Sequence, residues 1–152
     1  MEDFFIQIAA NRPLWSGFIA WALAQLIKPP LRYLTHREWD WGLLLSAGGM
    51  PSSHSALVMG ATVGIGIQEG FYSSIFALAA VLSGIVIYDA TGVRRQAGDH
   101  ARIINLMIDE LFTGHPLAEK ELKERLGHTP REVLGGIVLG IVTAVVLMNS
   151  LA

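Results

Sequence analysis

The sequence predicts an all-α membrane protein: a polytopic bundle of four transmembrane helices with an amphipathic cytoplasmic loop between helices three and four. Two observations predict this class. Hydrophobic residues make up 52% of the 152 residues and charged residues only 16%, against about 25% in a typical soluble domain. The charged residues are also gathered into a few stretches. They leave four apolar segments close to the length of a bilayer-crossing helix, about 20 residues.

The four apolar segments place helices at about residues 13–28, 51–68, 71–90 and 132–150, within a single membrane domain over 1–152. The sequence Lys28-Pro29-Pro30 is expected to end the first helix, because proline lacks the N–H that a helix interior needs. The last segment has no polar face at helical spacing. Small residues at every fourth position indicate close packing of the second and fourth helices, namely Ala56, Gly60 and Gly64, and Gly136, Gly140 and Ala144.

The polar loop over residues 95–130 is too long for a bare connection. Residues 101–112 have the spacing of an amphipathic helix, and residues 117–126 that of a strongly charged one. The first of these is expected either to lie on the membrane surface or to cover the end of the bundle.

The basic residues predict the orientation. Ten of the 11 Lys and Arg residues lie in the loops over residues 28–40 and 89–131. By the positive-inside rule these loops face the cytoplasm, and both termini of this multi-pass cell-membrane protein are external. Basic residues would also gather in these loops if they held an anionic ligand. Two explanations of their position therefore stay open, membrane orientation and ligand binding. Residues 1–11 lack the basic start of a cleavable signal peptide.

Three polar clusters are expected to meet at one membrane face, because successive helices alternate in direction. These clusters, at residues 48–55, 88–95 and 127–132, open the second helix, close the third and open the fourth. Helix starts present unpaired N–H groups and attract anions, so the face suits phosphate. The net charge of −2 gives no footprint for nucleic acid.

The residue types at this face suit phosphoryl transfer. His54 and His128 have the chemistry of a general acid and a nucleophile. Structural interpretations stay open beside this one: Thr129 and Glu132 have the spacing of a capping box. Asp89 is expected to pair with a cation or line a polar cavity. The other candidates, which either hold phosphate or serve as helix starts and lipid contacts, are Lys28, Ser52, Ser53, Arg94 and Arg95.

We expect no metal and no cofactor. The chain has no cysteine, which excludes thiolate ligands. Asp89, Asp99 and His100 match no dedicated metal motif.

The motifs at residues 48–56, 88–95 and 127–133, taken in order, resemble the divergent PAP2 family, small membrane proteins related to acid phosphatases and vanadium-dependent haloperoxidases. The resemblance implies that Lys28 binds phosphate. It also implies that His54, in a Pro-Ser-Ser-His variant of a Pro-Ser-Gly-His motif, protonates the leaving group. His128 would then be the nucleophile and Glu132, in place of an Asp, would orient it.

Two positions depart from the wider superfamily, which has arginines where this chain has Thr35 and Leu122. Two functions therefore stay open. One is a phosphatase that hydrolyses a lipid phosphate or pyrophosphate through a phosphohistidine. The other is a non-catalytic membrane protein that binds a phosphorylated lipid headgroup or a protein partner. Membrane lipids are the expected partners, and a homo-oligomer is compatible with either function.

Overall fold

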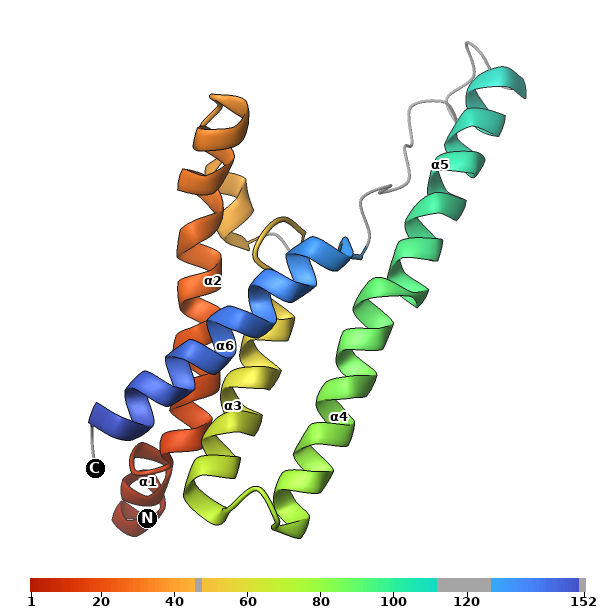
Figure 1. Ribbon diagram of the computed structural model, residues 1–152. Coiled ribbons are helices and arrows are strands. Elements are labelled where there is room, and N and C mark those ends of the chain that lie inside the picture. The colour runs from red at the N-terminus through yellow and green to blue at the C-terminus, as the bar shows by residue number, and fades with distance from the viewer. Residues whose placement is uncertain (46–47, 112–126, 151–152) are drawn as a thin grey trace.

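The structure is a computed structural model that describes residues 1–45, 48–111 and 127–150 (Figure 1). The described elements are all helical, as the sequence predicts. They are α1 (Glu2–Ala9), α2 (Arg12–His36), the short 3₁₀ helix η1 (Trp41–Leu45), α3 (Ser53–Glu69), α4 (Ser74–Thr91), α5 (Val93–Leu111) and α6 (Pro130–Ser150).

The long helices alternate in direction (Figure 1). Helices α2 and α4 run one way, α3 and α6 run the other way, and both chain ends lie at the same end of the bundle. Polar side chains set several of the helix starts: Asn11, Ser52 and Ser73 each accept a hydrogen bond from a backbone N–H in the first turn of α2, α3 and α4. This alternation brings the starts of α3 and α6 together at the end opposite the termini (Figure 1).

Helix α2 does not end at Lys28-Pro29-Pro30, as expected from the sequence, but continues through both prolines to His36. The prediction was wrong because a proline removes a hydrogen-bond donor yet holds its own φ angle in the helical range. Lys28 and Pro29 are fully buried, so tertiary packing holds the chain helical there. The sequence analysis also did not foresee α1, which precedes the Asn11 cap.

Helices α2, α3 and α6 form the core, and small residues let their backbones approach closely. A Cβ on Gly60 would lie 2.7 Å from the Ser16 carbonyl oxygen, and one on Gly140 would lie 2.6 Å from that of Ala56. Both stripes of small residues predicted from the sequence are buried in this core. A third stripe on α2, at Ser16, Ala20 and Ala24, supplies the matching surface.

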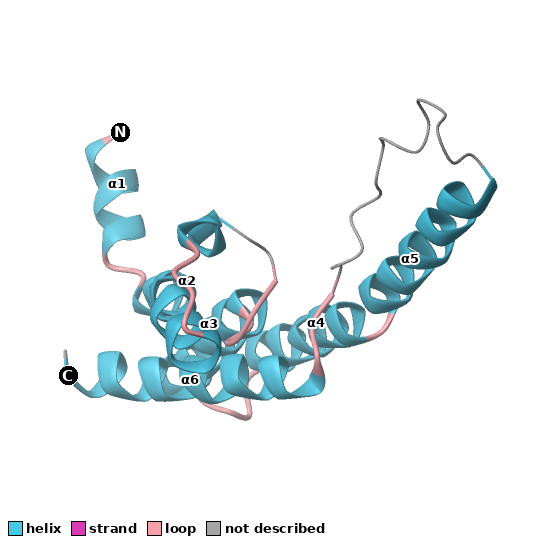
Figure 2. Cartoon of the chain, turned by 90° about the horizontal axis from the view of Figure 1, so that it is seen from above, coloured by secondary structure: helices cyan, strands magenta, loops and turns pink. Residues whose placement is uncertain are grey.

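Helix α4 packs mainly along α3 (Figure 2). Much of its apolar surface is exposed. After the single residue Gly92 the chain continues as α5, which extends away from the bundle (Figures 1 and 2). The amphipathic helix predicted over residues 101–112 is therefore part of a longer helix, and it does not cover the end of the bundle. The second helix predicted in this loop, at residues 117–126, lies outside the described residues.

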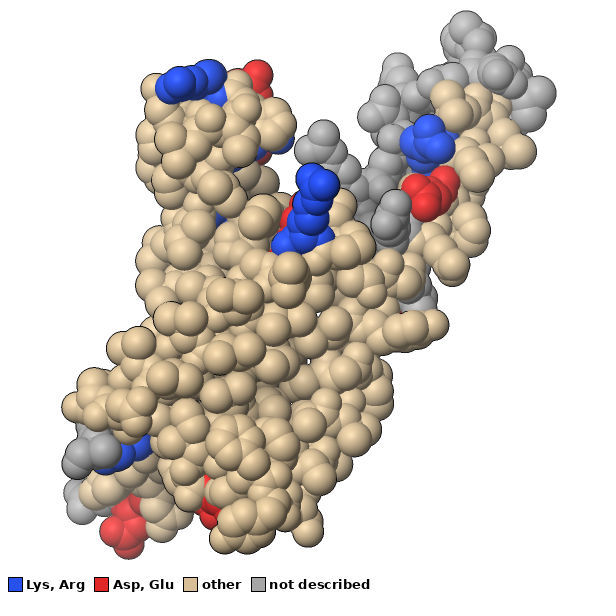
Figure 3. All heavy atoms as spheres, viewed as in Figure 1, with Lys and Arg blue, Asp and Glu red and all other residues tan. Residues whose placement is uncertain are grey.

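The surface has the character of a membrane protein. Figure 3 shows Lys, Arg, Asp and Glu gathered towards the two ends of one face, with a wide band of other residues between them. Among the described residues, two helical stretches are long and apolar enough to cross a bilayer: Ser74–Ile108, which joins α4 and α5, and Pro130–Ser150. Helix α3 has 17 residues, about 25 Å at 1.5 Å per residue, slightly less than a bilayer core of about 30 Å.

Candidate functional site

The start of α3 is joined to the start of α6. The Ser52 hydroxyl caps α3, accepting from the Ser55 N–H at 3.3 Å and from the Ser55 hydroxyl at 3.1 Å. The backbone N–H of Ser52 donates to the Glu132 carbonyl oxygen at 2.8 Å. The hydroxyl and the N–H of Ser52 therefore both help to cap and join the two helix starts. Ser53, the neighbouring candidate, is buried, and its N–H has no acceptor among the described residues.

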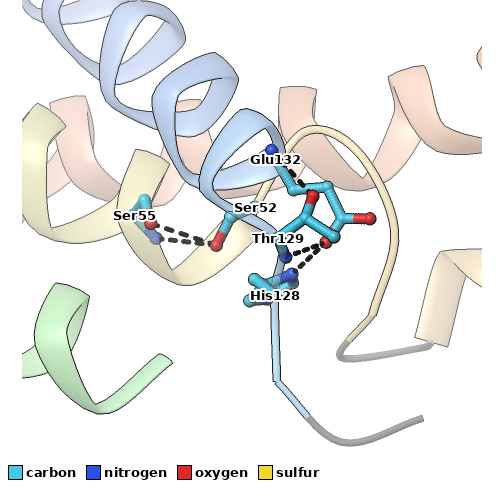
Figure 4. Close-up of polar contacts among 5 residues, drawn as sticks. All are labelled: Ser52, Ser55, His128, Thr129 and Glu132. Atoms are coloured by element: carbon cyan, nitrogen blue, oxygen red, sulfur yellow. Dashed lines mark hydrogen bonds and ion pairs between the residues drawn. The ribbon is translucent and has the colours of Figure 1, made fainter. Parts of the chain in front are cut away.

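The start of α6 carries the predicted capping box (Figure 4). The Thr129 N–H donates to Glu132 Oε2 at 3.0 Å, and the Glu132 N–H donates to Thr129 Oγ1 at 3.4 Å. The N–H of His128, just before the box, donates to the Ala90 carbonyl oxygen near the end of α4 at 2.9 Å. Three helices distant in sequence therefore fix the backbone around His128.

The same Glu132 oxygen also orients the His128 ring, with Nδ1 and Oε2 3.2 Å apart (Figure 4). A carboxylate is an acceptor, so we assign a proton to Nδ1, and the Nδ1–H donates this hydrogen bond to Glu132. In a neutral ring of this tautomer the lone pair is on Nε2, the other ring nitrogen. His128 is only 4% exposed, so its ring is held in one orientation by a buried contact.

The two histidines predicted as acid and nucleophile face one another across the helix starts. Their ring centroids are 6.3 Å apart, with the planes tilted by 57°. A nucleophile stands about 3–3.5 Å from the atom it attacks, and a proton donor stands a hydrogen-bond length, about 2.7–3.0 Å, from its acceptor. The separation of 6.3 Å between the ring centres is of the same order as these two contact lengths taken together.

Lys28 lies at this site as a buried cation, with 1% of its surface exposed. Its side chain passes beside Gly49, where a Cβ would lie 3.9 Å from the Lys28 Cδ. Its charge interacts with that of Glu132. Burying a lysine costs free energy, and here the carboxylate that orients His128 offsets part of that cost.

The remaining candidates lie at the same end of the bundle but are less well defined. Asp89 is half-buried and immediately precedes Ala90. Arg94 and Arg95 are in the first turn of α5, and their side chains lie outside the described part of the structure, as does Leu122. The Thr35 hydroxyl donates to carbonyl groups of its own helix at Leu31 and Arg32. Thr35 therefore does not supply the contact of the arginine that it replaces.

Within the described residues, no group of three or more His, Cys, Asp or Glu side chains is arranged to hold a metal ion.

Sequence reasoning missed the backbone contacts that assemble the site. The carbonyls of Ala90 and Glu132 accept hydrogen bonds from His128 and Ser52, and any residue type offers a carbonyl. The stripe at Ser16, Ala20 and Ala24 was also missed, although its spacing of four would have revealed it.

The fold and site define an all-α membrane protein with two histidines at joined helix starts. A model of the divergent PAP2 family matches residues 9–143. YuiD, an uncharacterized membrane protein of Bacillus subtilis (strain 168), is 44% identical over 153 aligned positions, gaps included. The match covers 93% of this chain and 97% of that protein. No solved structure matches the chain. The chain belongs to the divergent PAP2 family.

Proposed function

We propose that this membrane protein is a PAP2-type phosphatase that hydrolyses a lipid phosphate or pyrophosphate through a phosphohistidine. One observation carries the proposal: the rings of His54 and His128 lie 6.3 Å apart, and Glu132 contacts the Nδ1 of His128. The proposed protein crosses the cell membrane four times, through α2, α3, α4 and α6. The motif-bearing end faces the cytoplasm and both termini are external.

In the first step, Nε2 of His128 attacks phosphorus while the ester bond to the leaving oxygen breaks. His54, protonated, gives its proton to that oxygen, so that the lipid leaves as an alcohol, or as a lipid phosphate if the substrate is a pyrophosphate. Glu132 stabilises the positive charge that develops on the His128 ring. Lys28 and the Ser53 N–H stabilise the phosphoryl oxygens, since such preorganised charges contribute most to phosphoryl transfer.

In the second step, neutral His54 takes a proton from a water molecule, which attacks the phosphorus of the phosphohistidine. The P–N bond breaks, Nε2 regains its lone pair, and inorganic phosphate is released. His54 is protonated again, so the site returns to its starting state. Arg94, Arg95 and Asp89 are proposed to complete the phosphate-binding face from the end of α4 and the start of α5.

A second function is favoured by a specific observation, the absence of two superfamily arginines. Thr35 takes the place of one of them, and its hydroxyl bonds to its own helix. With fewer cations the same site would bind a phosphorylated lipid headgroup without hydrolysing it. Under this alternative the protein is a binding or assembly module of the membrane.

The decisive experiment measures phosphate release from lipid phosphates and pyrophosphates by purified protein, with His128→Ala as the test variant. We expect release by the native protein and none by the variant. The matched control is His36→Ala, because His36 is exposed and contacts only its neighbour Thr35 among the described residues. Quenching the reaction of labelled substrate with alkali should trap a phosphohistidine, which is stable in base and is hydrolysed in acid.

Turnover that is unchanged by His128→Ala would overturn the enzymatic proposal. Absence of turnover across the panel, together with lipid-phosphate binding that Arg94→Ala or Arg95→Ala abolishes, would instead support the binding function.

A further inference from the structure

Three aromatic rings form a stacked ladder where α2 ends and η1 begins. The ring centroids of Tyr33 and Trp39 are 4.8 Å apart with planes at 18°, and those of Trp39 and Trp41 are 5.3 Å apart with planes at 10°. The stacking leaves large apolar areas uncovered, since Trp39 is 53% exposed and Trp41 is 65% exposed. An exposed cluster of this kind marks a contact surface.

The two acidic residues beside the ladder, Glu38 and Asp40, each have a partner a few residues away in the sequence. Glu38 pairs with Arg32 at 3.5 Å, and the Asp40 carboxylate accepts from the Gly42 N–H at 3.0 Å. The guanidinium of Arg37 lies over the Tyr33 ring, 5.9 Å from its centroid. The surface thus combines broad aromatic faces with a cation at one edge.

The length of α2 places this ladder at a particular depth. Helix α2 begins at Arg12, the charged residue at the end of the bundle that carries the termini. At 1.5 Å per residue, Tyr33 lies about 31 Å further along the helix. The hydrocarbon core of a bilayer is about 30 Å thick. If α2 crosses the bilayer, Tyr33 emerges where hydrocarbon gives way to headgroups.

We propose that the ladder of Tyr33, Trp39 and Trp41 is an interfacial anchor whose partner is the headgroup and glycerol layer of the bilayer at the motif-bearing end. Tyrosine and tryptophan concentrate in this layer because they combine an apolar ring with a polar group. Arg37 meets the anionic phosphates of the same layer. The proposal rests on α2 crossing the bilayer and is independent of catalysis.

The anchor sets the depth of the candidate site. Leu43 of η1 and Lys28 of α2 lie 4.0 and 3.9 Å from the position of a Cβ on Gly49, so the anchored segment contacts the residues beside the buried lysine. Lys28 lies one and a half turns before Tyr33 along α2, about 7 to 8 Å deeper. A lipid phosphate that enters from the anchored layer thus has to descend by about one and a half helical turns.

The experiment uses the four tryptophans of the chain as depth probes in the full-length protein. Single-tryptophan variants are made by Trp→Phe changes, which keep an aromatic ring at each ladder position. One variant retains only Trp39, and the control retains only Trp21, which lies in α2 about 14 Å from Arg12. Each is reconstituted in phospholipids brominated either near the carbonyl end or near the methyl end of the acyl chains.

We expect Trp39 fluorescence to be quenched more strongly by the bromines near the carbonyl end, and Trp21 fluorescence more strongly by those near the methyl end. Trp39 that is quenched by aqueous iodide but by neither lipid, beside a Trp21 that is quenched by lipid, would overturn the anchor alone. Trp39 that matches the depth profile of Trp21 would overturn it too, since the ladder would then lie in the hydrocarbon. A Trp21 that neither lipid quenches would overturn the four-crossing topology as well.

Discussion

Helices α6 and α4 are both long and apolar, yet they are held in the molecule very differently. Glycines bring α6 against α3 at backbone distance: a Cβ on Gly140 would lie 2.6 Å from the Ala56 carbonyl oxygen. A Cβ on Gly84 of α4 would meet no described atom within 4 Å. Helix α4 lies along α3, and one hydroxyl pair between them is Thr62 and Ser83, whose oxygens are 2.7 Å apart.

This difference separates two properties that one apolar segment can carry. Apolar length decides whether a helix is suited to a bilayer, and the spacing of small residues decides whether it packs closely against its neighbours. The candidate site follows the packing: His54, His128 and Lys28 all lie on the closely packed helices or at their starts. Helices α4 and α5, which we call the α4–α5 arm, contact the site through the Ala90 carbonyl oxygen, which accepts a hydrogen bond from the His128 N–H.

The largest effect is expected from His54→Gln, which removes the proposed proton donor from the packed core. General acid catalysis typically contributes about 10²- to 10⁴-fold, so release of the alcohol from an alkyl phosphate in a single turnover should slow by that factor. Release of p-nitrophenol from p-nitrophenyl phosphate in a single turnover should slow much less, because this leaving group needs no proton. Both rates are measured with the protein in excess over substrate, so that the later hydrolysis of the phosphohistidine, which also uses His54, does not limit them. His100→Gln on the exposed face of α5 is the control. Equal losses of the two release rates would assign His54 to positioning rather than to proton donation.

A smaller effect, on stability, is expected from filling the glycine contact of the core. Gly140→Leu would force a side chain against backbone atoms, and overpacking of this kind costs about 3 kcal/mol or more when the neighbours cannot move. The matched variant on the arm is Gly84→Leu, which faces open space and should change the free energy of unfolding by less than about 0.5 kcal/mol. Unfolding in detergent by a denaturing surfactant measures both. Similar losses in the two variants would show that α4 is packed as closely as α6.

The same contrast explains what the sequence could predict. The capping box at Thr129 and Glu132 depends on a local spacing of three residues, and the structure has it. The meeting of His54 and His128 followed from alternating helices, and the rings are indeed close. These features need only local geometry or the order of apolar segments.

Other features depend on tertiary contacts that composition does not encode. The continuation of α2 past Pro29 and Pro30 depends on the burial of its neighbours, which outweighs the missing N–H groups. The joining of the two helix starts depends on the bond from the Ser52 N–H to the Glu132 carbonyl oxygen. The direction of α5 depends on a single connecting residue, Gly92. No spacing rule in a single sequence specifies such contacts.

The smallest effect is expected from the hydroxyl pair that joins α4 to α3. Thr62→Val and Ser83→Ala each remove one partner of the bond, and Thr62 also donates to the Ala79 carbonyl oxygen at 3.3 Å. Interhelical hydrogen bonds in membrane proteins contribute about 0.6 kcal/mol on average and at most about 1.7, so a double-mutant cycle should give a coupling in this range. Thr143→Val is the control, because the Thr143 hydroxyl donates within its own helix, to the Leu139 carbonyl oxygen at 2.8 Å. The variant Thr143→Val should show no coupling energy with Ser83→Ala. A coupling near zero for Thr62 and Ser83 would mean that their bond adds nothing to the attachment of α4, and that its apolar contacts along α3 alone hold the arm in place.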